Sequence, residues 1–188
     1  MNVFDFDNTI YRGESFVDIF LMVLKRDPSL LKNVPYMVNG VVQYKAGTLR
    51  LENVFEKYSK IFEEYVVTIG DLNGLVTEFW DKHIHKVKTF YDDVRTEDDL
   101  VISASPEIVI AEICRRIGIK NYIGTQFDTQ TGKLGRVCFR EKKIEAFFER
   151  YPDGRIENLY TDSMHDKPLM DISDNVYFVK GNKITKIK

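Results

Sequence analysis

The chain has few cysteines and no excess of charge of either sign. Cys114 and Cys138 are the only two cysteines in 188 residues, and they lack C-x-x-C spacing and clustered metal-ligating neighbours. We therefore predict buried, reduced thiols rather than a redox pair or a zinc site. The 27 basic and 29 acidic residues give a net charge of −2. Because no basic excess is available to attract a polyanion, we predict no nucleic-acid partner.

Long hydrophobic runs are also absent. The apolar stretch 16–24 is interrupted by Asp18, and it is much shorter than the roughly 20 residues that a membrane span needs. No secretory signal precedes Asp5. We expect a cytoplasmic protein without stable membrane insertion, and a monomer. The composition, 44% hydrophobic and 30% charged, is typical of one globular core or a core with a small insert.

The order of predicted elements indicates an α/β fold. A short strand at residues 3–4 is followed by a helical segment, in which Ser15 is expected to cap the first helix and further helices are predicted at 34–45, 49–65 and 72–87. Buried strands are predicted at 100–103, 158–161 and 176–179, a hairpin at 122–139, helices at 106–118 and 141–150, and a short edge strand in 180–188.

Strands that alternate with helices in this way predict a doubly wound, mainly parallel sheet. Residues 1–13 and 89–188 would form this α/β core domain. Residues 14–88 would form an inserted, all-helical cap domain.

Polar side chains recur where the predicted strands end. Asp5 and Asp7 follow the first strand, Ser103 ends the next, and Asp162 follows the strand at 158–161. In a doubly wound sheet these positions meet along one edge, which is where ligands bind. Taken singly, each residue has an ordinary explanation, such as an acidic turn, a turn serine or a helix cap. Taken together, they predict one polar site.

This pattern resembles the four motifs of the haloacid dehalogenase superfamily of phosphohydrolases. The motifs are Asp5-x-Asp7-x-Thr9, then Ser103, then Lys143, then Asp162-x-x-x-Asp166, each in the same order as in that superfamily. The inserted helical segment is similar to the cap of its phosphoserine phosphatase-like branch. The resemblance implies a Mg²⁺-dependent phosphatase that hydrolyses a phosphate monoester through an aspartyl-phosphate.

The resemblance also implies a role for each matching residue. Asp5 would be the nucleophile, and Asp7 would serve as general acid and then as general base. Thr9, Ser103 and Lys143 would bind the phosphoryl group. The metal site would comprise Asp5, Asp7 through its backbone carbonyl, Asp162 and Asp166, which suits the oxygen ligands that Mg²⁺ prefers. Glu14 falls where these phosphatases carry a glutamate that contacts the substrate amine.

Three alternatives remain open at this stage. The substrate is predicted to be a small phosphorylated metabolite resembling phosphoserine. Arg50 and Lys45 are candidates for the arginine that binds its carboxylate in such phosphatases, but neither stands in a motif. The apolar residues of that segment are also compatible with a lipid or isoprenoid phosphate. A different class of function is a module that accepts a phosphoryl group without turnover, although Asp7 favours turnover because it supplies the base that breaks down the acyl phosphate.

Overall fold

The computed structural model describes residues 1–33, 35, 39 and 63–188. In this part of the chain a single six-stranded sheet has the order β3-β2-β1-β4-β5-β6. The strands are β1 (Asn2–Phe4), β2 (Leu100–Pro106), β3 (Asn121–Thr125), β4 (Ile156–Thr161), β5 (Ser173–Lys180) and β6 (Lys183–Lys186). The pairs formed by β1 to β5 are parallel, and β6 is an antiparallel edge strand. The predicted α/β fold with a mainly parallel sheet is therefore confirmed.

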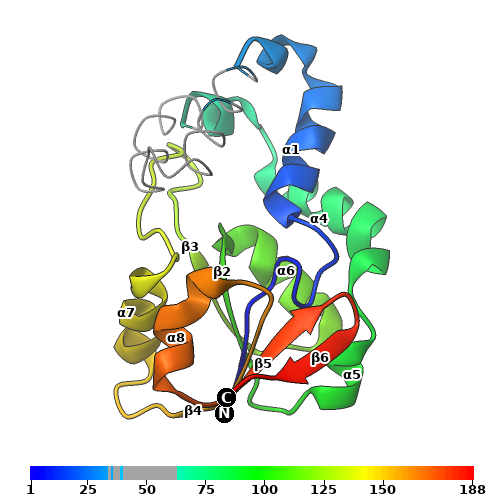
Figure 1. Ribbon diagram of the computed structural model, residues 1–188. Helices are drawn as coiled ribbons and strands as arrows, with labels where there is room; N and C mark the ends of the chain where they lie inside the picture. The colour runs from blue at the N-terminus through cyan, green and yellow to red at the C-terminus, as the bar shows by residue number, and fades with distance from the viewer. Residues whose placement is uncertain (34, 36–38, 40–62) are drawn as a thin grey trace.

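The helices occupy both faces of this sheet (Figure 1). They are α1 (Ser15–Arg26), α4 (Leu72–His83), α5 (Phe90–Val94), α6 (Glu107–Ile117), α7 (Glu141–Arg150) and α8 (Lys167–Ile172), with 3-10 turns η1 (Pro28–Asn33), η2 (Ile84–Lys86) and η3 (Met164–Asp166). A further helical stretch covers 63–68. The helices predicted at 34–45 and 49–65 lie largely outside the described residues.

Alternating side chains of the strands form two separate hydrophobic clusters. Val3 and Leu100 belong to a cluster with Phe147 of α7, whereas Phe4 and Val101 belong to a cluster with α4, α5 and α6. All of these side chains are fully buried. Because successive residues of a strand point to opposite faces, a strand buried on both faces must be apolar at every position. The continuous apolar runs in the sequence reflect this three-layer arrangement.

The segment between α1 and α5 leaves the core and returns to it at neighbouring points. Tyr11 and Val87 form an antiparallel bridge, and the Arg12 amide donates to the Lys86 carbonyl at 2.9 Å. Trp80 of α4 is completely buried and donates from Nε1 to the Val109 carbonyl of α6. The last helix of the segment 14–88 thus shares the hydrophobic cluster of the α/β core. The boundaries of a separate cap domain stay a prediction.

Two local predictions differ from the structure. Ser15 does not cap α1, because Glu14 occupies the N-cap position and the Ser15 amide instead donates to Asp7. The second strand of the predicted hairpin is not formed as an element, since 133–139 makes only an isolated bridge, between Leu134 and Phe127. The Gln126 amide donates to the Arg136 carbonyl and the Gly135 amide to the Gln126 carbonyl, in place of a regular ladder. By contrast, Gly118 ends α6 as predicted, in the left-handed conformation at φ +79°.

Gly124 allows β3 to approach the start of α6 closely. A Cβ atom at this position would lie 2.6 Å from Cα and 2.9 Å from N of Glu107, which are backbone atoms that cannot move aside alone. We therefore expect Gly124→Ala to lower the free energy of unfolding by about 1–3 kcal/mol, as overpacking does. Gly70→Ala is the matched control, because nothing lies within 4 Å of its added Cβ. Urea denaturation of both variants measures the difference, and equal stability would contradict the packing argument.

Candidate active site

The acidic loop begins where β1 ends. The Asp5 amide still belongs to the sheet, donating to the Tyr160 carbonyl of β4 at 2.9 Å, and the loop then closes on itself through Thr9 and Tyr11, whose amides donate to the Phe6 carbonyl. Asn8 within this loop adopts the left-handed conformation at φ +57°. Because the backbone turns here, the directions of the Asp5 and Asp7 side chains are not set by the alternation of a strand.

Lys143 joins two distant carboxylates at this loop. Its Nζ lies 2.9 Å from Oδ1 of Asp5 and 2.7 Å from Oδ1 of Asp166. The Lys143 and Asp166 side chains are each 3% exposed. Lys143 is the third residue of α7, and Asp166 ends η3 after β4. Lys143 thus contacts Asp5 across 138 residues of sequence, and its buried ammonium group joins this carboxylate to that of Asp166.

The single positive charge of Lys143 does not balance the carboxylates around it. Burial lowers the tendency of Lys143 to be charged, but Asp166 and Asp5 outweigh it and raise the pKa of the ammonium above its ordinary value. Burial also raises the pKa of Asp5 well above its ordinary value; Lys143 opposes this, whereas Asp166 and Asp7 add to it. One ammonium shared by buried carboxylates leaves the site short of positive charge.

Both oxygens of the Asp7 carboxylate are held by protein donors. The Ser15 amide donates to Oδ1 at 2.6 Å, and the Ser105 hydroxyl donates to Oδ2 at 2.5 Å. Burial raises the pKa of Asp7, although both of these hydrogen bonds oppose the rise. A carboxyl group with a raised pKa retains a proton more readily, which suits a general acid.

Ser103, Thr9 and Asp162 complete the group predicted from the sequence. Ser103 lies within β2, is 1% exposed, and accepts from the Ser105 amide through its hydroxyl oxygen at 3.1 Å. No acceptor for its hydroxyl hydrogen occurs among the residues that the structure describes. Thr9 is buried and donates to Oδ1 of Asp162 at 3.4 Å. Burial raises the pKa of Asp162 above its ordinary value.

Parallel pairing of β1 with both β2 and β4 explains why these residues meet. Phe4 lies opposite Val101 and Tyr160 in the ladder, so Asp5, Ser103 and Asp162 all follow at the same edge of the sheet. Glu14 lies further out: its exposed side chain accepts from Nδ2 of Asn8 at 2.6 Å. The structure therefore brings seven of the eight predicted residues together and places Glu14 beside the loop that carries them.

Three residues near the site were not predicted as part of it. Ser15 and Ser105 hold Asp7, and Lys88 is 4% exposed with its Nζ donating to the Asn8 carbonyl. Burial lowers the pKa of Lys88, and nearby Asp162 opposes that change. Ser105 could have been predicted from the sequence, because it follows the motif residue Ser103 by two positions. No local signal marks Lys88, because only the return of the chain after η2 brings it to the acidic loop.

The donor set fits a hard divalent cation. Among the described residues, no group of three or more His, Cys, Asp or Glu side chains could by itself hold a metal ion. The predicted ligand set needs only two carboxylates in direct contact, those of Asp5 and Asp162, with the Asp7 carbonyl and waters. Burial raises the pKa of both carboxyls, and the nearby charge of Asp166 adds to the rise in each; a cation at this edge would favour their ionised forms.

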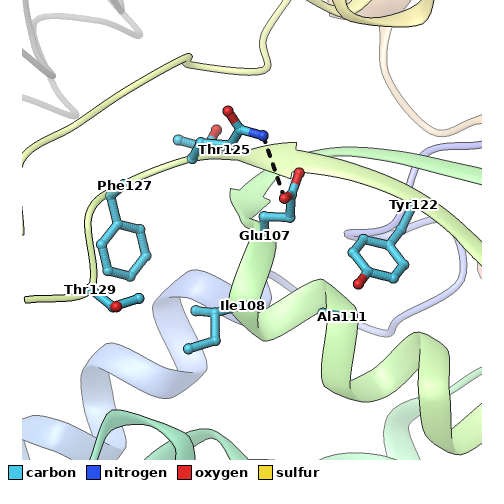
Figure 2. Close-up of a pocket in the computed structure, with 8 residues that line it drawn as sticks. Glu107, Ile108, Ala111, Tyr122, Thr125, Phe127 and Thr129 are labelled. Atoms are coloured by element: carbon cyan, nitrogen blue, oxygen red, sulfur yellow. Dashed lines mark hydrogen bonds between the residues drawn. The ribbon is translucent and has the colours of Figure 1, made fainter. Parts of the chain in front are cut away.

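A separate open pocket of about 430 Å³ lies between the start of α6 and the end of β3. Figure 2 shows Tyr122 and Phe127 on opposite sides of Glu107 and Ile108. The carboxylate of Glu107 already accepts from the Gly124 amide at 3.1 Å and from Gln126. None of the predicted site residues lines this pocket. The polar edge and the pocket are therefore distinct features.

Comparison with protein families decides the class of the molecule. The model of the haloacid dehalogenase-like hydrolases matches residues 3–171. The chain belongs to this hydrolase family. The prediction of a hydrolase of the haloacid dehalogenase superfamily is thereby confirmed. A search of curated proteins found no match.

Solved structures share the fold of this haloacid dehalogenase-like hydrolase. A protein of unknown function from Bordetella pertussis Tohama I is 21% identical, with a TM-score of 0.74, covering 91% of this chain and 85% of its own. A phosphoserine phosphohydrolase-like protein from Francisella tularensis is 19% identical, with a TM-score of 0.64 and coverages of 94% and 86%. A phospho-aspartyl intermediate analogue of phosphoserine phosphatase is 16% identical, with a TM-score of 0.57 and coverages of 93% and 83%.

No helix in the described part of this hydrolase combines the length and the apolarity that crossing a bilayer requires.

Lys143 is expected to be essential for the stability of the site at neutral pH. Lys143→Met leaves the buried carboxylates of Asp5 and Asp166 without their cation, so we expect a loss of about 3–5 kcal/mol in the free energy of unfolding. Lys143 opposes the rise that burial causes in the pKa of Asp5. Without Lys143, native Asp5 binds a proton that the unfolded chain releases, so this loss is largest at pH 7 and shrinks toward pH 5. Chemical denaturation in buffer with a chelator measures it at both pH values.

Lys142→Met is the matched control for this variant. Lys142 is the preceding residue, its side chain is 55% exposed, and it pairs with Glu145. Removal of an exposed pair should change the stability by no more than about 0.5 kcal/mol. Equal destabilisation by the two substitutions, or a Lys143→Met deficit that grows as the pH falls, would contradict the role assigned to the buried ion pair.

Proposed function

We propose that this hydrolase is a phosphatase that cleaves phosphate monoesters through an aspartyl-phosphate on Asp5. The observation that carries the proposal is the buried contact of Asp5 with Lys143, next to an Asp7 whose burial favours the protonated acid. Lys143 occupies Oδ1 of Asp5, and no donor contacts Oδ2 among the described residues. A nucleophilic oxygen, a cation and a proton donor are the groups that phosphoryl transfer requires.

In the first step, a carboxylate oxygen of Asp5 forms a bond to phosphorus, and the bond from phosphorus to the ester oxygen breaks. Asp7 gives its proton to the departing oxygen, so that an alcohol rather than an alkoxide leaves. The Lys143 ammonium and the Ser103 hydroxyl, for whose hydrogen the described residues offer no acceptor, are suited to stabilise the negative oxygens of the phosphoryl group. Asp166 keeps Lys143 at the correct place.

In the second step, Asp7 accepts a proton from a water molecule, and the water oxygen forms a bond to phosphorus. The bond between phosphorus and Asp5 breaks, which releases inorganic phosphate and restores the carboxylate. One group therefore serves as acid and then as base. Asp7 therefore distinguishes an enzyme that completes the catalytic cycle from a module that stays phosphorylated.

A divalent cation, which we propose to be Mg²⁺, would be held by Asp5, the Asp7 carbonyl and Asp162, with Asp166 orienting its waters. When bound, it would neutralise charge on the phosphate ester and on the crowded carboxylates. Thr9 donates to Asp162 and so would set the orientation of that ligand. Its predicted contact with phosphate itself stays a prediction.

The first test is the hydrolysis of p-nitrophenyl phosphate with Mg²⁺ and with a chelator. We expect turnover only with the metal, and Asp5→Asn should lower kcat by at least about 10³-fold because the nucleophile is lost. Asp174→Asn is a control at an exposed pair with Arg155, far from the site, and should match the wild type. Equal activity of Asp5→Asn and wild type would overturn the proposal.

A module that accepts a phosphoryl group without turnover would differ from a phosphatase by accumulating as phosphorylated protein. Mass spectrometry after mixing with acetyl phosphate should find little phosphorylated wild type, because Asp7 promotes its breakdown. A wild-type protein that stays stably phosphorylated while releasing no phosphate would support the module instead of the phosphatase.

We propose a small phosphorylated metabolite with an amino group, resembling phosphoserine, as the substrate. The support is the exposed carboxylate of Glu14, which lies beside the acidic loop through its contact with Asn8. A lipid-like phosphate remains the second candidate. It is favoured by three exposed apolar residues on α1, Phe16, Val17 and Leu21, which are 38%, 48% and 49% exposed.

Glu14→Gln removes the charge of this side chain but keeps an acceptor for Asn8. We expect KM for O-phosphoserine to rise by about fivefold, which corresponds to about 1 kcal/mol for an exposed ion pair, and KM for p-nitrophenyl phosphate to stay unchanged. Glu97→Gln, at an exposed position outside the site, should change neither. More efficient hydrolysis of a long-chain alkyl phosphate than of O-phosphoserine, with no effect of Glu14→Gln, would favour the lipid-like substrate.

A further inference from the structure

Two serine hydroxyls form a buried chain behind Asp7. Ser105 donates to Oδ2 of Asp7 at 2.5 Å, and the hydroxyl oxygens of Ser15 and Ser105 lie 3.0 Å apart. A hydroxyl has one hydrogen to donate. That of Ser105 points to the carboxylate, and the Ser15 side chain, which contacts the Ser105 hydroxyl, also helps to lower the pKa of Asp7. Both serines are nearly inaccessible, with 0% and 4% exposure.

The two donors to Asp7 come from different parts of the chain. Ser15 is the first residue of α1, and its amide donates to Oδ1. Ser105 lies near the end of β2, where its own amide is held by the Ser103 hydroxyl. The carboxylate is therefore fixed on one oxygen by the start of α1 and on the other by β2. Rotation about the terminal torsion of an aspartate is soft, so these two bonds determine its plane.

We infer that Ser105 is a positioning residue that holds the carboxyl group of Asp7 in the orientation in which it protonates the leaving oxygen. The inference rests on the proposed phosphatase activity. Ser105 needs no contact with the substrate for this role, since it acts through Asp7. Small errors in the placement of a catalytic group lower the rate substantially, and general acid catalysis matters most when the leaving group is poor.

The test compares Ser105→Ala with wild type on phenyl phosphate and p-nitrophenyl phosphate. The two esters share a ring, but the phenol leaves less readily than the nitrophenol and depends more on protonation. We expect kcat/KM of Ser105→Ala to fall about tenfold more for phenyl phosphate than for p-nitrophenyl phosphate. Asp7→Asn should show the same selective loss, and Ser105→Thr, which keeps the hydroxyl, should largely restore activity on phenyl phosphate.

Ser173→Ala is the matched control. Ser173 is 2% exposed and donates to the Leu169 carbonyl at 2.7 Å, outside the proposed site. This variant loses a buried serine hydrogen bond as Ser105→Ala does, but we expect it to keep the wild-type ratio of the two kcat/KM values. If Ser105→Ala does not fold, Ser105→Cys keeps the shape with a weaker donor and should show the selective loss.

Each outcome has a distinct meaning. An equal fall for both esters, or no fall, would overturn the positioning role while leaving the phosphatase proposal intact. Failure of Ser105→Thr to restore activity would also overturn it. If wild type hydrolysed neither ester with Mg²⁺ present, the proposed function would fail, and the inference would fail with it.

Discussion

The buried ion pair of Lys143 with Asp5 and Asp166 is the constraint on which the site depends. It joins the first strand, the start of α7 and the turn after β4 through two contacts shorter than 3 Å. An ammonium ion removed from water is stable here only because both carboxylates surround it. The same carboxylates exceed its charge, so the fold leaves the edge of the sheet electrostatically suited to a cation and to the negative charge of a reacting phosphate.

The connections of the helical segment support the same loop. Lys88 donates to the Asn8 carbonyl, and its amide donates to Ile10 at 2.8 Å, where the segment rejoins the core. Ser15, at the other connection, holds Asp7. The acidic loop is therefore braced at both points where the chain leaves and returns. A displacement of Ser15 or Lys88 would therefore act on the acidic loop through direct hydrogen bonds, which link the helical segment to the proposed acid.

The sequence predicted elements well where their patterns were local and strong. The helix expected at 141–150 is α7, Gly118 ends α6, and the tail contains an edge strand. It failed at Ser15 because a distant carboxylate, Asp7, competes for the helix terminus. It also failed for the strand at 133–139, where the chain makes an isolated bridge at Leu134 instead of a ladder. At Ser15, a tertiary contact outweighed the local preference.

The sequence by itself determined the apolar strands, their order with the helices, and the identity of the acids and the lysine, because these follow from periodicity and residue chemistry. Only the tertiary structure decided which of them meet. Parallel pairing of β1 with β2 and β4 places Asp5 beside Ser103 and Asp162, and the return of the chain brings in Lys88. Ser105 gains its role in the same way, since its contact with Asp7 spans 98 residues, and no local pattern encodes a hydrogen bond across that separation.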